Sequence, residues 1–399
     1  MHTKNTAYYL IVLFVIAATV LSACGGAAPA ATQVPAATMA PAMTEAPAAT
    51  TAPAAADPMA DLAAACKTEG MLTIIATPAS WANYGAIFEL FKSKSGAQLN
   101  GLDENAGSSD ELAAIDANKG NTGPQAPDIV DVGYAYGDQA KAAKQIQAYK
   151  VSNWDSIPDK VLGLPAKDPD GFWTAGYYGV MAFEVNTAVV KNVPASFADL
   201  LKPEYKGQVA LAGDPRSSNQ AAQSVIAAAL SNGGSFDNIQ PGLDFFKKLN
   251  DAGNYVPVIA KQGTLAQGAT PIVMAWNYNA YGDKDALAGN PEVAVVYPSP
   301  SIAGMYVQAI SAYAPHPNCA KLWMEILHSD EGQLAWVKGY AVPVHLDDMN
   351  KRNVIPADLK ALLPTVEASA PTPAQLAAAR DAIKTGWDTT VGVDIPKAP

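Results

Sequence analysis

The sequence predicts an α/β protein with two lobes, each a mixed sheet flanked by helices, joined by two crossing strands. Short apolar runs that suit buried strands alternate along residues 61–399 with segments of helical periodicity. This part of the chain is longer than one ordinary domain, which favours two lobes. Two longer strand-like runs, at 176–186 and 305–314, are placed to carry the chain between the lobes and back.

The N-terminus has the features of a lipoprotein signal peptide. An apolar run from Tyr8 to Val20 is too short to span a bilayer comfortably and suits a signal-peptide core. It ends in Leu21-Ser-Ala-Cys24, which resembles the bacterial lipobox, whose cysteine becomes the lipidated first residue. We expect residues 1–23 to be removed and Cys24 to be acylated, which would anchor the protein to the outer, periplasmic or extracellular face of the cell membrane. The alternative is an ordinary secreted protein with a stray cysteine.

Residues 24–60 are predicted to be a disordered tether behind the lipid. They consist almost entirely of Ala, Pro, Thr and Met and cannot bury enough surface to fold. No other segment is long and apolar enough to cross a membrane, so the lipid would be the sole anchor. The net charge of −11 argues against a nucleic-acid partner.

With Cys24 lipidated, Cys66 and Cys319 remain as an even pair in an oxidising compartment. They are candidates for one disulfide, with two unpaired buried thiols as the alternative. The chain has no CxxC motif and no Cys/His cluster, so we expect no structural metal.

The first lobe is expected to begin with a strand at 72–76 and a helix that runs to Phe91. A Ser108-x-x-Glu111 capping box predicts a second helix, and 127–133 forms the next strand, followed by a helix at 138–148. Open α/β sheets bind ligands beyond the ends of their strands. The candidate ligand-binding residues in these loops are Ser80, Trp81, Ser108, Ser109 and Tyr134.

The second lobe is expected to contain a small-anion cradle. Residues 209–211 suit a short buried strand, and Gly213-Asp-Pro supplies a turn that carries Arg216. Ser217 and Ser218 suit the start of the alanine-rich helix that follows, whose free backbone N–H groups attract a negative group. Under a second interpretation the serines only cap the helix and Arg216 pairs with a surface carboxylate.

Aromatic and amide residues gather at another strand end in the same lobe. A helix at 241–250 precedes a buried strand at 271–276, which leads directly into a predicted loop at 277–282. The second crossing strand and a helix capped by Asn318 follow. The further ligand-binding candidates are Tyr178 on the first crossing strand and Trp276, Asn277, Tyr278 and Tyr281.

Five segments in order resemble the type 2 substrate-binding proteins of bacterial ABC importers, in the branch that includes ferric-ion, thiamine, polyamine and aminoethylphosphonate binders. They are residues 126–133, 178–187, 197–207, 214–218 and 314–333. The resemblance implies the type 2 periplasmic-binding fold, which closes on its ligand like a hinge. Lobe 1 would comprise 61–176 completed by about 298–345, and lobe 2 would comprise 177–297 with part of 346–399.

The function that the resemblance implies is capture of a small polar solute and its delivery to ABC permease and ATPase subunits. We expect a monomer that binds an anion-bearing solute, with Arg216 supplying the charge. A ferric binder that uses Tyr278 and Tyr281 with a synergistic anion is one alternative, and a polyamine or thiamine binder is another. Asn277 and Asn279 stand where polyamine binders would carry carboxylates.

Catalytic motifs are missing from the sequence. There is no GxSxG, P-loop or HExxH pattern, so we expect neither an enzyme nor a cofactor. An enzyme or sensor on the same fold is the competing class of function.

Overall fold

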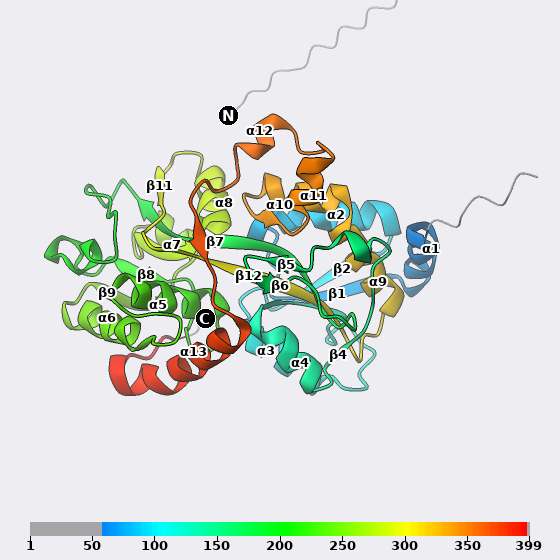
Figure 1. Ribbon diagram of the computed structural model, residues 1–399, viewed down its shortest axis with the longest axis horizontal. Coiled ribbons are helices and arrows are strands. Elements are labelled where there is room, and N and C mark those ends of the chain that lie inside the picture. The colour runs from blue at the N-terminus through cyan, green and yellow to red at the C-terminus, as the bar shows by residue number, and fades with distance from the viewer. Residues whose placement is uncertain (1–57, 397–399) are drawn as a thin grey trace, which may run out of the picture. The chain divides into compact units, whose positions relative to one another are not determined.

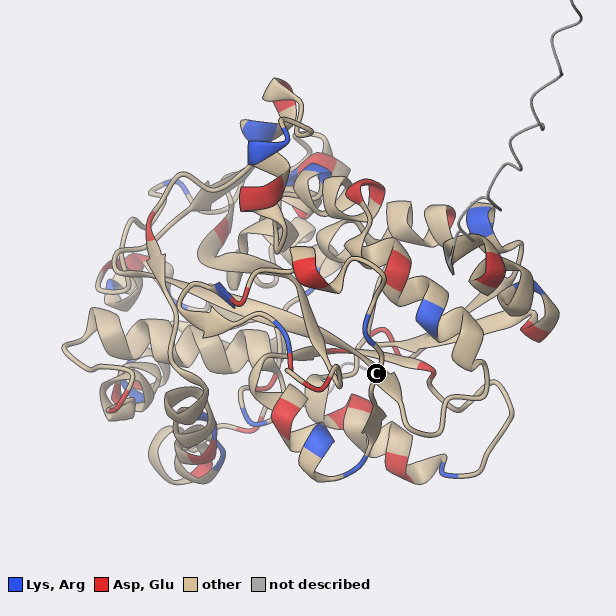
Figure 2. Cartoon of the chain, turned by 45° about the vertical axis from the view of Figure 1, so that its right-hand side comes forward, with Lys and Arg blue, Asp and Glu red and all other residues tan. Residues whose placement is uncertain are grey.

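The computed structural model describes residues 58–396, which belong to one compact unit. The expected signal peptide, Cys24 and nearly all of the expected tether lie outside the described residues. Within the described range, no helix combines the length and the apolar character that a membrane span needs. Acidic and basic residues are scattered over the elements of the chain (Figure 2).

A continuous mixed sheet organises the described part of the chain (Figure 1). Its main path runs in the order β2-β1-β3-β12-β7-β10-β8-β9. The strands are β2 (Gln98–Leu102), β1 (Met71–Ile75), β3 (Ile129–Gly133), β12 (Ser301–Ser311), β7 (Thr174–Asn186), β10 (Ile272–Trp276), β8 (Val209–Leu211) and β9 (Tyr255–Ile259). Short strands at its margins are β4 (Ile146–Gln147), β11 (Val293–Val296), β13 (Val342–Pro343) and β14 (Ala368–Ser369).

Two long antiparallel strands, β7 and β12, connect the two halves of this sheet. The first part of β7 pairs with β12 between Val180 and Thr174. The second part of β7 pairs with β10 and β11, which belong to the other half. The α/β fold with two crossing strands is therefore confirmed, and we call the β1-side and β8-side parts the first and second halves.

Helices cover both halves of the sheet. The first half carries α1 (Pro58–Glu69), α2 (Tyr84–Ser95), α3 (Ser108–Ala117), α4 (Ala135–Ala142), α9 (Pro317–His328) and α10 (Asp330–Lys338). The second half carries α5 (Asn219–Ser231), α6 (Gln240–Asp251), α7 (Gln262–Ala266) and α8 (Asn277–Leu287). The chain ends with α11 (Leu346–Lys351), α12 (Ala357–Lys360) and α13 (Pro373–Gly386), the last of which contacts α4 as well as α5 and α6.

Three helices differ from the sequence-based expectations. The expected loop at 277–282 is the start of α8, and the helix expected at 138–148 is α4, which ends before Lys144 adopts a left-handed conformation. Helix α9 begins at Pro317, so Asn318 does not cap it. Instead, the Glu69 carboxylate accepts hydrogen bonds from the backbone N–H groups of Asn318 and Cys319, which supplies the acceptor that this helix end requires.

The two described cysteines form a disulfide between α1 and α9. Cys66 and Cys319 are fully buried, with an S–S distance of 2.03 Å. The bond joins residues 253 positions apart, so it closes a very long loop in the unfolded chain. In the chain-entropy account, restricting the unfolded state in this way stabilises the folded protein.

Replacing both cysteines should destabilise the protein measurably. We expect a Cys66→Ala/Cys319→Ala variant to lose about 3 to 5 kcal/mol of unfolding free energy, because the unfolded chain regains the freedom of a long loop. Chemical denaturation of the parent with reductant present should give the same loss. Equal midpoints for variant and parent, or two alkylated thiols in the denatured and non-reduced parent, would contradict the bond.

Candidate functional site

Two adjoining cavities lie where strands of both halves end, and we refer to them together as the cleft. Their volumes are about 120 Å³ for the first cavity and about 280 Å³ for the second. Both are lined by residues that follow β1, β2, β8 and β9, which is where open α/β sheets place ligands. The shared lining residues are Pro78, Trp81, Glu104, Asn105, Ala212, Gln220 and Lys261.

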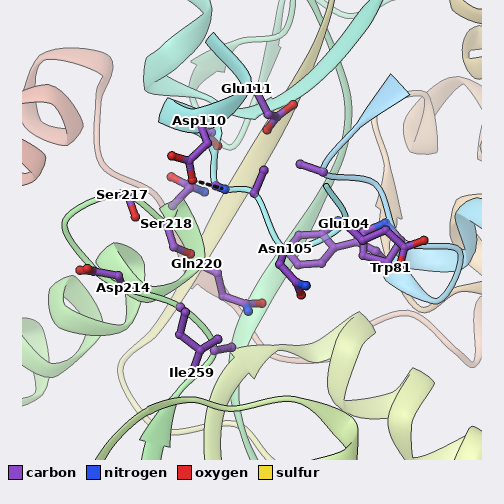
Figure 3. A pocket seen from close by; sticks show the side chains of 18 of the residues that line it. Trp81, Glu104, Asn105, Asp110, Glu111, Asp214, Ser217, Ser218, Gln220 and Ile259 are labelled. Atoms are coloured by element: carbon purple, nitrogen blue, oxygen red, sulfur yellow. Dashed lines mark hydrogen bonds between the residues drawn. The ribbon is translucent and has the colours of Figure 1, made fainter. Parts of the chain in front are cut away.

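Figure 3 shows how residues from both halves face each other across the first cavity. Trp81, Glu104 and Asn105 come from loops of the first half. Asp214 and Ser218 come from the turn between β8 and α5 in the second half. A solute in this space would therefore contact both halves.

Carboxylates dominate the charged lining of the cleft. Lys261 is the single basic residue among the described residues that line the two cavities, and burial lowers its pKa. The acidic lining residues are Glu104, Asp110, Glu111, Asp131 and Asp214 in the first cavity and Glu104, Glu184 and Asp283 in the second.

Asp131 and Glu111 are the two buried acids of the first cavity, and Asp131 has the larger set of side-chain partners. It accepts hydrogen bonds from the hydroxyls of Tyr84, at 2.7 Å, and Tyr177, at 2.8 Å, and from the amide of Gln308. Burial nevertheless raises the pKa of Asp131 to about 7, and it raises the pKa of Glu111 well above its usual range. Glu111 accepts a hydrogen bond of 2.9 Å from Asp131 N, and neither carboxylate forms an ion pair in the part of the chain that the structure describes.

Trp81 forms an aromatic wall that both cavities share. Its indole N–H donates a hydrogen bond of 2.6 Å to the Tyr177 hydroxyl, which in turn donates to Asp131. Its ring packs edge-on against Tyr278 and Tyr306, with centroid distances of 5.4 and 5.6 Å. This relay fixes the orientation of the indole, so its exposed face is available to a solute without rearrangement.

The backbone that carries Trp81 is held in an uncommon conformation. Ala82 and Asn83, which follow it directly, both have positive φ angles, of 44° and 65°. Such residues are found where the surrounding structure enforces them, often at ligand sites. Here the Asn83 amide donates a hydrogen bond of 2.9 Å to the Ala335 carbonyl and ties the loop to α10.

Five of the sequence-predicted residues line the cleft. Trp81 lines both cavities, Ser80 the second, and Ser108, Ser217 and Ser218 the first. The Ser218 side chain caps α5 by accepting a hydrogen bond from Ala221 N. The Ser108 hydroxyl accepts a hydrogen bond from Gly133 N. The capping box of α3 was expected from Ser108 and Glu111, but here the Asp110 carboxylate accepts a hydrogen bond from the Gly107 N–H.

Arg216 does not line the cleft. Its guanidinium forms ion pairs with Asp214, Asp388 and Asp394 at 2.7, 2.7 and 3.0 Å. It faces a third cavity of about 830 Å³ instead, together with the predicted residues Ser109 and Tyr134. The expected charge donor is therefore neutralised within the protein, because the turn and the C-terminal segment bring three carboxylates to it.

The remaining predicted residues lie outside both cavities. Trp276 and Tyr278 are fully buried behind Trp81. The Asn277 amide accepts from Val180 N and donates to the Tyr340 carbonyl, and Tyr281 stacks on the Tyr340 ring at 4.8 Å. Tyr178 lies in β7, half-buried where β13 pairs with that strand.

The acidic lining of the cleft was not predicted from the sequence. Glu104 and Asn105 follow β2, whose sequence Gln-Leu-Asn-Gly-Leu has little of the apolar character by which strands are recognised. Asp131 offered a signal, because it is a carboxylate in the middle of an otherwise apolar buried strand. Asn219, at the start of α5, also lines the first cavity, and neither polar atom of its amide has a hydrogen-bond partner among the described residues.

The model for a family of bacterial extracellular solute-binding proteins matches residues 125–368. A spermidine/putrescine-binding periplasmic protein of Escherichia coli (strain K12) is 30% identical over 217 residues, which are 50% of this chain and 58% of that protein. The chain thus spans less than two thirds of the curated relatives that it matches.

Solved structures of periplasmic binding proteins share the fold. The fructose-6-phosphate-bound protein AfuA of Actinobacillus pleuropneumoniae has a TM-score of 0.62 at 22% identity, covering 81% of this chain and 98% of its own. Iron-bound HitA of Pseudomonas aeruginosa has a TM-score of 0.58 at 18% identity, covering 81% and 99%. These likenesses establish the predicted type 2 periplasmic-binding fold.

The buried Asp131 should make stability depend on pH. Its folded pKa of about 7 exceeds the value of ~3.9 for an unfolded aspartate, so its contribution is greatest below the unfolded pKa and is lost as pH rises through the folded one. We expect the unfolding free energy of the parent, relative to Asp131→Asn, to fall by up to about 4 kcal/mol between about pH 4 and about pH 7. Denaturation at several pH values measures this difference. The exposed Asp155→Asn is the control, and its unfolding free energy should depend on pH as that of the parent does. If the difference in unfolding free energy between the parent and Asp131→Asn does not change with pH, the assignment is refuted.

Proposed function

Because the chain belongs to the family of bacterial extracellular solute-binding proteins, we propose that it captures a small polar solute in the cleft and passes it to the permease of an ABC importer. The protein would act as a binding protein without catalysis, as a monomer. The two lobes, 61–176 with about 298–345 and 177–297 with part of 346–399, would close on the solute about β7 and β12.

We propose further that the solute is a small amine with at least one positive charge. The observation that carries this proposal is the acidic lining of the cleft, in which Glu104, Glu111 and Asp131 face a single lysine. Burial raises the pKa of Glu111 and Asp131, and the charge of Asp131 adds to the rise at Glu111. A bound ammonium group would favour the ionised forms of both carboxyl groups. The face of Trp81 adds a cation–π contact.

The sequence-based expectation of an anion-bearing solute is the second candidate. Its main support was Arg216, whose ion pairs with three aspartates leave it no free charge for a ligand. What still favours it is the N-terminus of α5, which borders the first cavity with Asn219, and the nearby Lys261. The relative named for spermidine and putrescine adds weight to the amine.

The ferric alternative has less support. Tyr278 is fully buried in the aromatic cluster, and burial raises its pKa well above the usual value, which disfavours a tyrosinate. Tyr281 stacks on Tyr340 and does not meet Tyr278 in either cavity. A thiamine-like solute would satisfy the same acidic lining as an amine, since it also carries positive charge.

Isothermal titration with putrescine, spermidine and thiamine tests the amine proposal. We expect binding by the parent and a loss of about three- to thirtyfold in affinity for Trp81→Ala, because the cation–π contact and the cleft wall are removed. Trp154→Ala is the matched control, since Trp154 lies outside both cavities. Binding of sugar phosphates or dicarboxylates in place of amines, with affinity that Arg216→Ala reduces, would favour the second candidate instead.

The lipid anchor concerns residues outside the described range and remains a proposal based on Leu21-Ser-Ala-Cys24. We expect Cys24→Ala to abolish labelling of the protein by radioactive palmitate in cells and to move it from the membrane fraction to the soluble one. The parent, expressed at the same level, is the control. A variant that still sediments with membranes would show that the anchor is wrongly assigned.

A further inference from the structure

A buried glutamate near the C-terminal end of β7 faces the second cavity. Glu184 is only 3% exposed. In the sheet it pairs with Val273 of β10 and Val295 of β11. Its Oε1 atom has no hydrogen-bond partner among the described residues. Ala260, Val273 and Ala275 make this part of the cavity wall apolar, so they offer the carboxyl group no hydrogen-bonding side chain.

A second carboxyl group meets Glu184 in the same cavity. Asp283, on α8, lines the same cavity and accepts a hydrogen bond of 2.9 Å from the Gln262 amide. Two carboxyl groups that face one buried cavity disfavour each other's ionisation, so the site favours one retained proton. Burial first, and then the charge of Asp283, raise the pKa of Glu184 well above its usual range.

The other charged groups that face this pair are Lys261 and Glu104. Lys261 favours the ionised form of Asp283, yet no ion pair joins it to either carboxylate in the described structure. Glu104 adds further negative charge at the boundary with the first cavity. The polar residues that complete the second cavity are Ser80, Asn105, Gln220, Gln262 and Asn279.

We propose that Glu184 and Asp283 form a second anchor in the cleft, which binds a terminal ammonium group of a diamine whose other ammonium group binds near Glu111 and Asp131. This rests on the proposed function, because it specifies the amine as one with two charged ends. The two anchors lie in adjoining cavities that share Trp81 as a wall, so the carbon chain between the ammonium groups would run along the indole. A monoamine would fill one anchor and leave the other in its free state.

Binding at this anchor involves a defined proton transfer. In the free protein burial and the neighbouring Asp283 favour the protonated form of Glu184. The incoming ammonium group donates N–H bonds to both carboxylates, and the Glu184 proton passes to the buffer. This anchor should therefore add up to about one proton, per diamine bound at neutral pH, to those that Glu111 and Asp131 release at the first anchor, and calorimetry in buffers of different ionisation enthalpy counts the total.

The decisive experiment compares 1,4-diaminobutane, longer α,ω-diamines and 1-aminobutane on the parent and on Glu184→Gln. We expect the variant to bind the best diamine about ten- to a hundredfold more weakly and to release up to about one proton fewer per diamine bound, because a charge-assisted bond and its titratable group are removed. Its affinity for 1-aminobutane should change less than about threefold. Glu292→Gln makes the same substitution at an exposed position of the same half and should match the parent.

Three further results decide between the proposals. Asp283→Asn should also lose affinity for the diamine and keep its affinity for 1-aminobutane. This second variant, together with the melting temperatures of both, shows whether the loss in Glu184→Gln comes from a folding defect. Diamine affinity and proton release that are unchanged in both variants would overturn the second anchor while leaving amine binding intact. If the parent binds neither amine, the amine proposal itself fails and the second anchor fails with it.

Discussion

The constraint on which the rest of this molecule depends is the continuity of β7 across both halves of the sheet. Its first residues pair with β12 and β13, and its last residues pair with β10 and β11. Because one strand serves both halves, the strand ends of each half are held near one another, and the cleft forms there. Tyr177, which orients Trp81 and Asp131, and Glu184, which faces the second cavity, both lie on this strand.

The cleft buries several carboxyl groups in a way that is unfavourable for the free protein. Asp131 and Glu111 in one cavity, and Glu184 with Asp283 in the other, are carboxyl groups whose pKa values burial raises. A fold selected for stability alone would gain by replacing such groups with apolar ones. Their presence at a cavity between two halves supports the proposed cationic solute, which would supply the missing charge.

Arg216 illustrates how a local pattern and its tertiary surroundings can disagree. The strand, turn and helix around it form as predicted, with β8 at 209–211 and α5 capped by Ser218. Its guanidinium, however, meets Asp388 and Asp394, which are 172 and 178 residues away in the chain. These contacts tie the β8–α5 turn to the C-terminal segment after α13, so the arginine acts as a structural clamp.

The sequence by itself determined the α/β class, the two crossing strands and most of the strands and helices, because apolar periodicity and capping residues act over short distances. It also identified Trp81 and the serines at the strand ends, since β1 and β8 are strongly apolar and stop at clear turns. Only the tertiary structure decided which charges meet in the cleft. Glu104, Asp131, Glu184, Lys261 and Asp283 come from separate elements, and their convergence depends on how β7 and β12 join the two halves. No local signal in the sequence carries that information, because long-range pairing places these carboxylates together and removes Arg216 from them.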